Sequence, residues 1–407
     1  MSKHQPALDW IATQQKQLLR RTTDWAMINT YSFNTVGMAK LTDILANEFS
    51  PLGGDILRHD LPPAESIDSR GQKIRTPLGQ ALSIIKRPQA PLRILLNIHT
   101  DTVYPPNNSP QPVTEIDGKL KGPGVADAKG GIAIMLTALE AFERFGLTDQ
   151  LGWQVVLNPD EEIGSPGSIS LLASVAKTNH LGLLFEPALA DGALVDQRRG
   201  SGIFAIIIRG RSAHAGRDFA NGRNAVVAAA QLTTRINVLN QSNPGVTLNI
   251  SAIDGGSPAN VVPDLAICRL NIRTTELADE QRILSSIQKL VNEINSLDGI
   301  SAELTGRFTS PPKILDDRTN QLLQAIISCG QDLGLSLTHR PSGGVSDGNK
   351  LAAAGLPNID TLGVRGDRIH SPDEFLFTDS LVERAQLVAL LLLKLAAGDI
   401  DPKPFCR

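Results

Sequence analysis

The chain has 407 residues, of which 41% are hydrophobic and 20% are charged, a composition typical of a globular protein with sizeable buried cores. Its 39 basic and 42 acidic residues leave a net charge of −3, and only 4% of the residues are aromatic. These values argue against a nucleic-acid-binding protein, because the chain lacks both a basic field and the aromatic side chains on which bases stack. At about 150 residues per domain, the length predicts two to three domains.

Cysteine usage and apolar runs predict the location of the protein. Cys268, Cys329 and Cys406 are widely spaced and form no CxxC pair, which argues against a disulfide framework and favours a reducing compartment. The N-terminal segment has no apolar run typical of a secretory signal. The longest apolar run, residues 387–393, is too short to span a bilayer. We therefore expect a soluble, cytoplasmic protein without a membrane partner.

Helices and strands alternate in the first 200 residues. Hydrophobic periodicity predicts helices over residues 5–21, 37–49, 130–145 and 166–177, and apolar runs predict strands over residues 92–98, 153–157 and 181–185. Polar turn material is expected in the interval before residue 92. Such alternation favours an α/β layer architecture.

Residues 203–306 follow a different pattern. Strands are predicted over residues 203–209, 246–252, 265–274 and 301–306, and helices over residues 222–240 and 279–297. The order βαββαβ is that of a ferredoxin-like sandwich. Helix and strand material then resumes and ends in a helix over residues 380–396. We therefore predict that an α+β domain of residues 201–307 is inserted into a larger α/β domain of residues 1–200 and 308–407.

Side chains with the chemistry of metal ligands follow the predicted strands. His99 and Asp101 come directly after the strand that ends at residue 98, and their i, i+2 spacing places both on one face if the strand continues. An aspartate in this place can hold the second ring nitrogen of a metal-binding histidine. Asp127 lies in a glycine-rich turn before a predicted helix, where a simple helix N-cap is an equal interpretation.

Three further segments contribute acidic or imidazole groups. Glu161 and Glu162 follow the strand over residues 153–157, where they form either an acidic loop or a metal ligand beside a general base. Glu186 ends the next strand, and His370 lies in a C-terminal loop. Parallel α/β sheets gather their ligands at the carboxyl ends of strands. Oxygen and imidazole groups without a thiolate suit a pair of zinc-like ions.

Taken in order, these segments resemble a known family. From His-Thr-Asp-Thr-Val at 99–103 to Ile-His-Ser-Pro-Asp-Glu at 369–374, the chain is similar to the zinc exopeptidases and deacylases that include glutamate carboxypeptidase, acetylornithine deacetylase and succinyl-diaminopimelate desuccinylase. The resemblance covers nearly the whole chain. It implies a mixed-sheet α/β catalytic domain with two zinc ions per subunit, and an inserted ferredoxin-like domain that serves as lid and as the contact of a homodimer.

The resemblance also implies a role for each ligand. His99 and Glu186 would bind one zinc ion, Glu162 and His370 would bind the other, and Asp127 would bridge the two and precede a cis peptide bond. Cobalt and manganese suit the same ligands.

Three residues are implied to act in catalysis. Asp101 would orient His99, and Glu161 would be the general base that takes a proton from the attacking water. His214, in the inserted domain, would reach across the dimer and stabilise the oxyanion. On its own, His214 is better explained as a polar turn histidine.

Substrate-binding residues are implied in both domains. Asn260 and Arg273 resemble lid residues of the family, and a guanidinium group suits a substrate carboxylate, although Arg273 taken alone is also consistent with a solvated strand residue. Asn271 stands where the family usually has aspartate. Gly344 and Ser346 lie in a glycine-rich loop that resembles the segment lining the substrate side of the pocket, with serine in place of the usual threonine.

The sequence thus predicts zinc-dependent hydrolysis of an amide or peptide bond in a small carboxylate-bearing substrate. The Glu-Pro-Ala segment at 186–188 and the Arg-Arg-Gly segment at 198–200 favour the carboxypeptidase branch that releases C-terminal glutamate. Two alternatives stay open: an N-acyl amino acid deacylase of the acetylornithine deacetylase type, and a metal-binding scaffold without catalytic activity. An RNA-binding sandwich is disfavoured, because Phe204 is the only aromatic residue on the predicted strands of the inserted domain.

Overall fold

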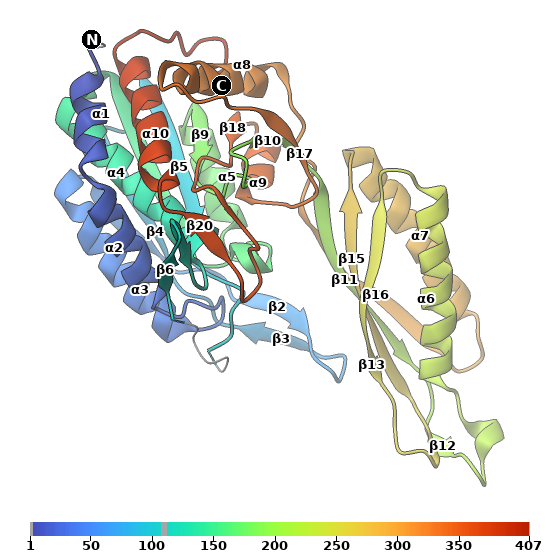
Figure 1. Ribbon diagram of the computed structural model, residues 1–407. Helices are drawn as coiled ribbons and strands as arrows, with labels where there is room; N and C mark the ends of the chain where they lie inside the picture. The colour runs from blue at the N-terminus through green and yellow to red at the C-terminus, as the bar shows by residue number, and fades with distance from the viewer. Residues whose placement is uncertain (1–2, 107–111, 407) are drawn as a thin grey trace.

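The computed structural model describes residues 3–106 and 112–406, and these form a larger body on the left of Figure 1 and an elongated body on the right. A mixed sheet lies at the centre of the larger body. Its six strands lie in the order β1 (Asp55–His59), β4 (Ala81–Lys86), β8 (Leu151–Asn158), β5 (Leu92–His99), β9 (Leu181–Leu184) and β18 (Asn358–Ile359). The last four are parallel to one another, whereas β4 is antiparallel to both β1 and β8. The carboxyl ends of β8, β5, β9 and β18 therefore meet at one edge of the sheet.

Helices cover both faces of this sheet (Figure 1). α4 (Gly130–Phe145) is buried on almost every side, because it packs between the sheet and an outer layer of helices. That layer comprises α1 (Gln5–Ala12), α2 (Gln15–Ala26), α3 (Thr35–Phe49), α8 (Asp317–Asp332) and α10 (Ser380–Ala396). On the other face, α5 (Ile169–Thr178) and α9 (Asp347–Ala353) enclose a smaller apolar cluster. The helices on both faces bury the sheet, and the loops that follow the carboxyl ends of its parallel strands are left to carry polar residues.

Several predicted bounds agree with the structure, whereas the N-terminal quarter differs. α4 and α10 span the predicted residues, and β15 does so in the elongated body. The single helix predicted over residues 5–21 is wrong. The hydroxyl of Thr13 donates a hydrogen bond to the carbonyl of Trp10 at 2.6 Å, and α2 begins only at Gln15.

The interval before residue 92 is also more regular than predicted. In addition to β1 and β4, it contains a hairpin of β2 (Ala64–Ile67) and β3 (Lys73–Thr76). Most side chains of β1, β2 and β3 are partly or fully exposed, so these strands lack the apolar runs on which the prediction relied.

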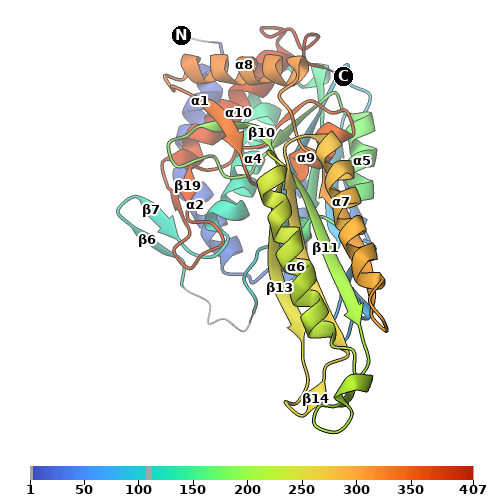
Figure 2. The same cartoon turned by 90° about the vertical axis from the view of Figure 1, so that its right-hand side faces the viewer.

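The elongated body is an antiparallel sheet with two helices on one face (Figures 1 and 2). Its strands lie in the order β13 (Thr247–Gly255), β15 (Leu265–Thr274), β11 (Gly200–Arg209) and β16 (Ser301–Ser310), and its helices are α6 (Ala225–Ser242) and α7 (Leu277–Asn295). The body encloses an apolar core of its own. The predicted ferredoxin-like inserted domain is thereby confirmed, and we call it the lid domain.

Shorter strands complete the fold. β10 (Leu194–Arg198) pairs in parallel with β17 (His339–Ser342). β12 (Ala213–His214) pairs with β14 (Val261–Val262) at the far tip of the lid domain in Figure 1. A small four-stranded sheet comprises β19 (Gly366–Asp367), β20 (Phe375–Phe377), β7 (Lys119–Lys121) and β6 (Thr114–Ile116). Within the described part of the chain, no helix has both the length and the apolar character that crossing a membrane requires.

Candidate active site

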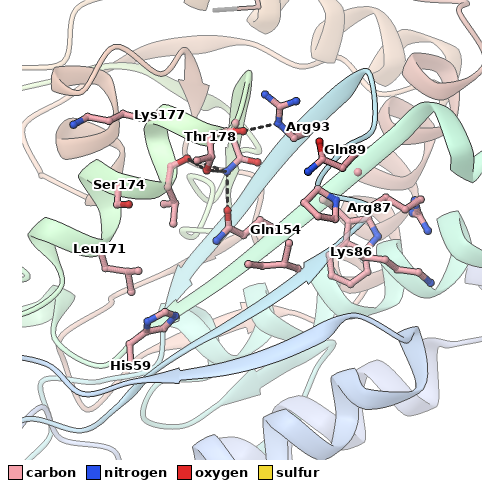
Figure 3. Close-up of a pocket in the computed structure, with 16 residues that line it drawn as sticks. His59, Lys86, Arg87, Gln89, Arg93, Gln154, Leu171, Ser174, Lys177 and Thr178 are labelled. Carbon is pink, nitrogen blue, oxygen red and sulfur yellow. Dashed lines mark hydrogen bonds between the residues drawn. The ribbon is translucent and has the colours of Figure 1, made fainter.

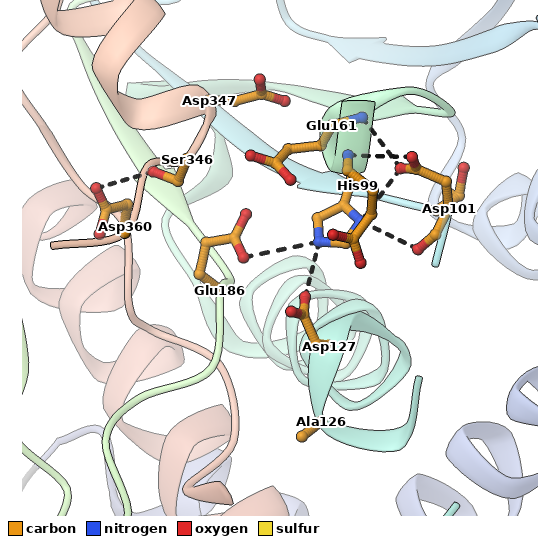
Figure 4. A network of polar contacts seen from close by, with 12 residues as sticks. His99, Asp101, Ala126, Asp127, Glu161, Glu186, Ser346, Asp347 and Asp360 are labelled. Atoms are coloured by element: carbon orange, nitrogen blue, oxygen red, sulfur yellow. Dashed lines mark hydrogen bonds and ion pairs between the residues drawn. The ribbon is translucent and has the colours of Figure 1, made fainter. Parts of the chain in front are cut away.

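His99 stands at the end of β5 and is only 1% exposed. Its Nδ1 lies 3.1 Å from the backbone carbonyl oxygen of Asp101, so this nitrogen is placed to donate the ring proton. The opposite nitrogen, Nε2, then faces Oδ1 of Asp127 at 2.8 Å and Oε2 of Glu186 at 3.7 Å (Figure 4). A histidine held in this way presents the Nε2 lone pair that a metal ligand needs.

Asp127 lies between two imidazole rings. Oδ1 faces His99, and Oδ2 lies 3.3 Å from Nε2 of His370. The same nitrogen of His370 lies 3.0 Å from Oε2 of Glu162. One Asp127 oxygen is thus turned toward the pair of His99 and Glu186, and the other toward the pair of His370 and Glu162. The peptide bond that follows Asp127 is cis, as the resemblance implies.

The topology explains why these five side chains meet. His99 ends β5, Glu162 lies in the short turn after β8, and Glu186 lies two residues beyond β9. These three strands are adjacent and parallel, so their carboxyl ends lie side by side. Asp127 comes from the loop that leads into α4, and His370 comes from the loop between β19 and β20.

Negative charge is in excess here, because the cluster has three carboxylates and only two imidazoles, and the carboxylate of Glu161 lies beside it. Burial raises the pKa of Glu161 well above its usual range, and the carboxylate of Glu186 raises it further. Burial together with the charge of Asp127 raises the pKa of Glu162 to about 7. Hydrogen bonds to Asp127 and Glu162 raise the pKa of His370 to about 11. A bound cation would stabilise such a set of carboxylates in their ionised form.

The donor atoms fit a divalent metal. One ligand atom each from His99, Asp127 and Glu162 lie within 4.8 Å of one another. All donors are imidazole nitrogens or carboxylate oxygens, which suit zinc, cobalt or manganese. The two oxygens of Asp127 face different histidines, an arrangement that provides for two ions rather than one.

Glu161 lies beside the ligands without pairing with either imidazole among the described ion pairs. Its backbone N–H donates to Oδ1 of Asp101 at 3.1 Å, and its carboxylate points toward Glu186 in Figure 4. A carboxylate in this place, with a raised pKa, can take up a proton and release it again.

A cavity of about 440 Å³ opens beside the cluster and is lined by residues of both bodies. Arg273 reaches it from β15, and its Nε donates to Oδ1 of Asn271 at 2.9 Å. Asn271 therefore holds the guanidinium group although it replaces the usual aspartate. Nη1 of Arg273 is buried and has no hydrogen-bond partner in the described part of the chain. Because an unpaired buried N–H is costly, this donor suits an anionic group of a ligand.

A larger hollow of about 630 Å³ lies away from the cluster, between α5 and the strands β4 and β8 (Figure 3). Its lining contains Lys86, Arg87, Arg93 and Lys177 but no carboxylate. The single histidine of the lining, His59, lies 3.0 Å from the hydroxyl of Ser83. One histidine and no carboxylate are too few donors to hold a metal ion, so we place the active site at the smaller cavity.

Two lid residues with predicted roles are remote from the cluster within one chain. His214 is exposed in β12 at the tip of the lid domain (Figure 1). Asn260 lies next to it, because its carbonyl accepts the backbone N–H of Ala215 at 2.8 Å. The structure therefore brings these two residues to each other and not to the metal ligands.

The glycine-rich loop contributes differently from expectation. Gly344 lines the cavity. The hydroxyl of Ser346 caps α9 by accepting the N–H of Gly348 at 3.1 Å, and it donates to Asp360 at 3.1 Å. Ser346 is 1% exposed, so its side chain stabilises the loop rather than facing the cavity. Arg198 lines the cavity as well, with Nε and Nη2 each 2.9 Å from an oxygen of Asp360.

Sequence reasoning assigned no role to three buried charged residues around the cluster. Lys129 is fully buried, burial lowers its pKa to about 8, and its Nζ donates to the carbonyl of Thr100 at 2.7 Å. Asp347 accepts the side-chain amide of Asn158 at 2.6 Å. Glu374 accepts the backbone N–H groups of Ala126 and Asp127, each at 3.0 Å. Each belongs to a segment that also supplies a predicted site residue, and that nearness in sequence was the only available signal.

Comparison with known proteins identifies the family. Residues 95–394 match the model of Peptidase family M20/M25/M40. The chain belongs to this family. Carboxypeptidase G2 of Pseudomonas sp. (strain RS-16) is 28% identical over 309 residues, which cover 75% of this chain and 74% of the relative. A succinyl-diaminopimelate desuccinylase of Methylococcus capsulatus is 31% identical over 328 residues, which cover 76% of this chain and 84% of the relative.

Solved structures of small-peptide peptidases share the fold. The dipeptidase Dug1p of Saccharomyces cerevisiae superposes with a TM-score of 0.76 at 15% identity, covering 98% of this chain and 99% of its own. A tripeptidase of Staphylococcus aureus gives a TM-score of 0.72 at 23% identity and covers 94% and 99% of the two chains. The predicted family and its α/β fold with an inserted lid are confirmed. As an M20 peptidase, the protein is a hydrolase that acts on amide bonds of small substrates.

Proposed function

We propose that this M20 peptidase is a zinc-dependent exopeptidase that cleaves the amide bond of a C-terminal residue, with glutamate as the favoured residue. The observation that carries the proposal is Arg273, which lines the same cavity as the metal ligands and whose buried Nη1 has no hydrogen-bond partner among the described residues. A substrate α-carboxylate would provide that partner. The similarity to carboxypeptidase G2 supports the choice of branch.

The metal ligands are proposed in two groups. His99 and Glu186 would hold one zinc ion, Glu162 and His370 the other, and Asp127 both. The orientation of the two Asp127 oxygens toward different imidazoles supports this division. When bound, the two ions would make water more acidic and polarise the scissile carbonyl.

The remaining roles belong to side chains of the protein. Glu161 would accept a proton from the attacking water and deliver it to the leaving amine, because its carboxylate lies beside the ligands and its pKa is raised. Asp101 would fix both His99 and Glu161. Arg273 would hold the carboxylate of the substrate and so align the amide bond, and backbone N–H groups near Gly344 would assist it.

A homodimer is proposed because part of the site is remote within one chain. His214 and Asn260 lie at the lid tip, so they would serve the active site of a partner subunit. β13 is an edge strand of the lid sheet, and Ile253 on it is 50% exposed, as is Val227 on α6. An exposed strand edge and apolar side chains favour pairing with a second copy. We also propose the catalytic domain as residues 1–200 and 308–407, the lid as 201–307, and a cytoplasmic location, which three free cysteines support.

A deacylase is the second candidate. It is favoured by the 31% identity to a succinyl-diaminopimelate desuccinylase, and an acetylornithine-type substrate also carries a carboxylate for Arg273. The inactive scaffold is disfavoured, because a structural metal site needs no spare base such as Glu161 and no open cavity beside it.

Amine release by zinc-reconstituted protein tests these functions. The substrates would be acyl-glutamates, simple dipeptides, N-acetyl amino acids and N-succinyl amino acids, each with a chelator control. Chelator-sensitive release of glutamate would support the carboxypeptidase, and release from N-acetyl or N-succinyl amino acids alone would support the deacylase. Zinc-loaded protein that cleaves none of them would favour the scaffold.

A further inference from the structure

Glu374 is a buried carboxylate whose two oxygens accept four hydrogen bonds. It is 1% exposed. Oε1 accepts the backbone N–H groups of Ala126 and Asp127, each at 3.0 Å. Oε2 accepts the backbone N–H of Gly124 at 3.1 Å and the hydroxyl of Tyr104 at 2.7 Å. With these four donors both oxygens are engaged, so Glu374 is not available as a metal ligand.

Three of the four donors belong to one short loop. Gly124, Ala126 and Asp127 are successive parts of the segment that ends in the bridging aspartate, and their N–H groups converge on a single carboxylate. Converging backbone N–H groups form a site for an anion. Gly124 has a φ of +73°, a backbone conformation in which any residue with a side chain would be strained. This conformation lets the loop turn around the carboxylate.

The other end of the contact is the turn that carries His370. Glu374 follows His370 by four residues, and its backbone N–H donates to the carbonyl of Ser371 at 3.2 Å. The hydroxyl of Tyr104 also lies 2.9 Å from that carbonyl. His370 has φ +61°, a conformation that side chains rarely adopt. Its turn therefore depends on contacts from outside, and Glu374 provides them.

A second contact between the two loops runs through the backbone. The N–H of Gly122 donates to the carbonyl of Glu374 at 3.1 Å. This backbone hydrogen bond and the side-chain hydrogen bonds make Glu374 a clamp between two segments. The segments lie about 250 residues apart in the sequence, as the hydrogen bond from Gly124 to Glu374 shows. One segment places Asp127, and the other places His370, whose Nε2 lies 3.3 Å from Oδ2 of Asp127.

We propose that Glu374 is a positioning residue that fixes the spacing between Asp127 and His370, and that Tyr104 completes its set of donors. The role rests on the two-metal site proposed above. Glu374 touches neither the substrate cavity nor the ligand atoms in the described contacts. It acts through the loop backbone, and its loss would let the bridging aspartate and the histidine move apart.

Glu374→Gln is the sharpest variant, because it keeps the size of the side chain and exchanges one acceptor oxygen for a donor. Whichever way the amide is turned, its NH₂ group would face at least one backbone N–H, of Gly124 or of Ala126 and Asp127. Tyr104→Phe is a milder variant that removes one donor and leaves the three N–H bonds. Asp279→Asn is a matched control, since Asp279 is a buried carboxylate at the start of α7 in the lid domain, away from the cluster.

The experiment measures three quantities on the full chain: amide hydrogen exchange over residues 122–128 without metal, cobalt affinity by calorimetric titration, and KM and kcat on the best substrate. For Glu374→Gln we expect exchange at least 10-fold faster in that loop. We expect cobalt affinity to fall by about 10–100-fold, as for other residues that support metal ligands. We expect kcat to fall in parallel, with KM changed by less than about 2-fold, since Arg273 is untouched. Tyr104→Phe should show smaller effects in the same direction, and Asp279→Asn none.

Loop exchange, cobalt affinity and kcat that all equal those of the wild type in Glu374→Gln would overturn the proposal. A lower melting temperature with unchanged cobalt affinity and unchanged KM and kcat would also overturn it, because Glu374 would then be only structural. If the wild-type protein binds fewer than two cobalt ions, the two-metal site fails instead. The exchange of the metal-free loop would still decide whether Glu374 orders it.

Discussion

Asp101 accepts a hydrogen bond on Oδ1 from the backbone N–H of Glu161 at 3.1 Å. Its other oxygen accepts the N–H of Glu162 at 3.1 Å and the hydroxyl of Ser32 at 2.7 Å. The backbone carbonyl of the same aspartate faces Nδ1 of His99. Asp101 is fully buried, so one residue connects a predicted ligand of each metal and the predicted base. The sequence assigned it only the orientation of His99.

Replacing Asp101 by asparagine should disturb Glu161 and Glu162 directly, because the Asp101 side chain accepts their backbone N–H groups, whereas the carbonyl that faces His99 is kept. The new NH₂ group would face the N–H of Glu161 or of Glu162, since both oxygens now accept backbone donors. We expect kcat and metal affinity to fall by about 10–100-fold, measured by steady-state kinetics and metal analysis after dialysis. Ser32→Ala removes a single bond and should cost much less. Equal activity of Asp101→Asn and wild type would show that these two N–H contacts do not matter.

Glu161→Ala separates an enzyme from a scaffold. Removal of a general base lowers rates by about 10²–10⁴-fold, so we expect turnover to fall by at least 100-fold. The ligand atoms of His99, Asp127 and Glu162 stay in place, so the metal content should match that of the wild type. Both values come from one preparation, by amine release and by elemental analysis. Retained turnover would remove Glu161 from the mechanism, and lost metal would make it a ligand instead.

The sequence predicted those parts of the fold that bury a regular apolar pattern. α4, β15 and α10 have the predicted bounds because most of the residues in each are buried, so the apolar pattern is regular from end to end. The strands β1, β2 and β3 were missed because their side chains are mostly exposed. The pairing of β10 with β17 was also missed, since it joins segments from distant parts of the chain and no local pattern encodes it.

The candidate site divides in a similar way. The ligand residues could be predicted from the sequence, because carboxylates and histidines that directly follow apolar strands are unusual and gather at one sheet edge. The role of Glu374 could not be predicted from the sequence, because its partners include backbone N–H groups about 250 residues earlier in the chain. Ser346 was assigned to substrate from its motif, yet its hydroxyl caps α9. Supporting roles of this kind depend on tertiary contacts that residue type does not reveal.

Arg273 should govern the affinity for carboxylate substrates. Arg273→Met keeps most of the apolar contacts of the side chain and removes the donor that has no partner among the described residues. A charge-assisted hydrogen bond contributes about 1.5–3 kcal/mol, so KM should rise by about 10–100-fold while kcat changes less. A substrate with an amidated C-terminus should be cleaved equally poorly by both proteins. The exposed Arg20 pairs with Asp24 on α2, and Arg20→Met is the control. An unchanged KM would place the carboxylate elsewhere in the cavity.

Asp360 should dominate the stability of the junction between the two domains. Its carboxylate is fully buried and accepts Nε of Arg198 and Nζ of Lys313, each at 2.9 Å. Arg198 and Lys313 lie on the two chain segments that cross between the domains, and their backbones exchange two hydrogen bonds of 2.9 Å. Asp360→Asn would leave two buried cations without their anion. Breaking a buried ion pair costs about 3–5 kcal/mol, so we expect a loss of that size in the free energy of unfolding at pH 7.

The loss should depend on pH in a defined direction. Burial alone would raise the pKa of Asp360, but Arg198 and Lys313 outweigh it and hold that pKa below its usual range. The stabilising contribution is therefore complete above the unfolded-state pKa of about 4 and declines as the pH falls toward the folded value. Urea unfolding at pH 7 and at pH 3 should show a smaller difference between Asp360→Asn and wild type at the lower pH. Asp254→Asn, which removes a partly exposed pair with Arg269, should cost less than about 1 kcal/mol at pH 7. A difference for Asp360→Asn that stays constant between the two pH values would mean that the hydrogen bonds accepted by this side chain, and not its charge, hold the junction.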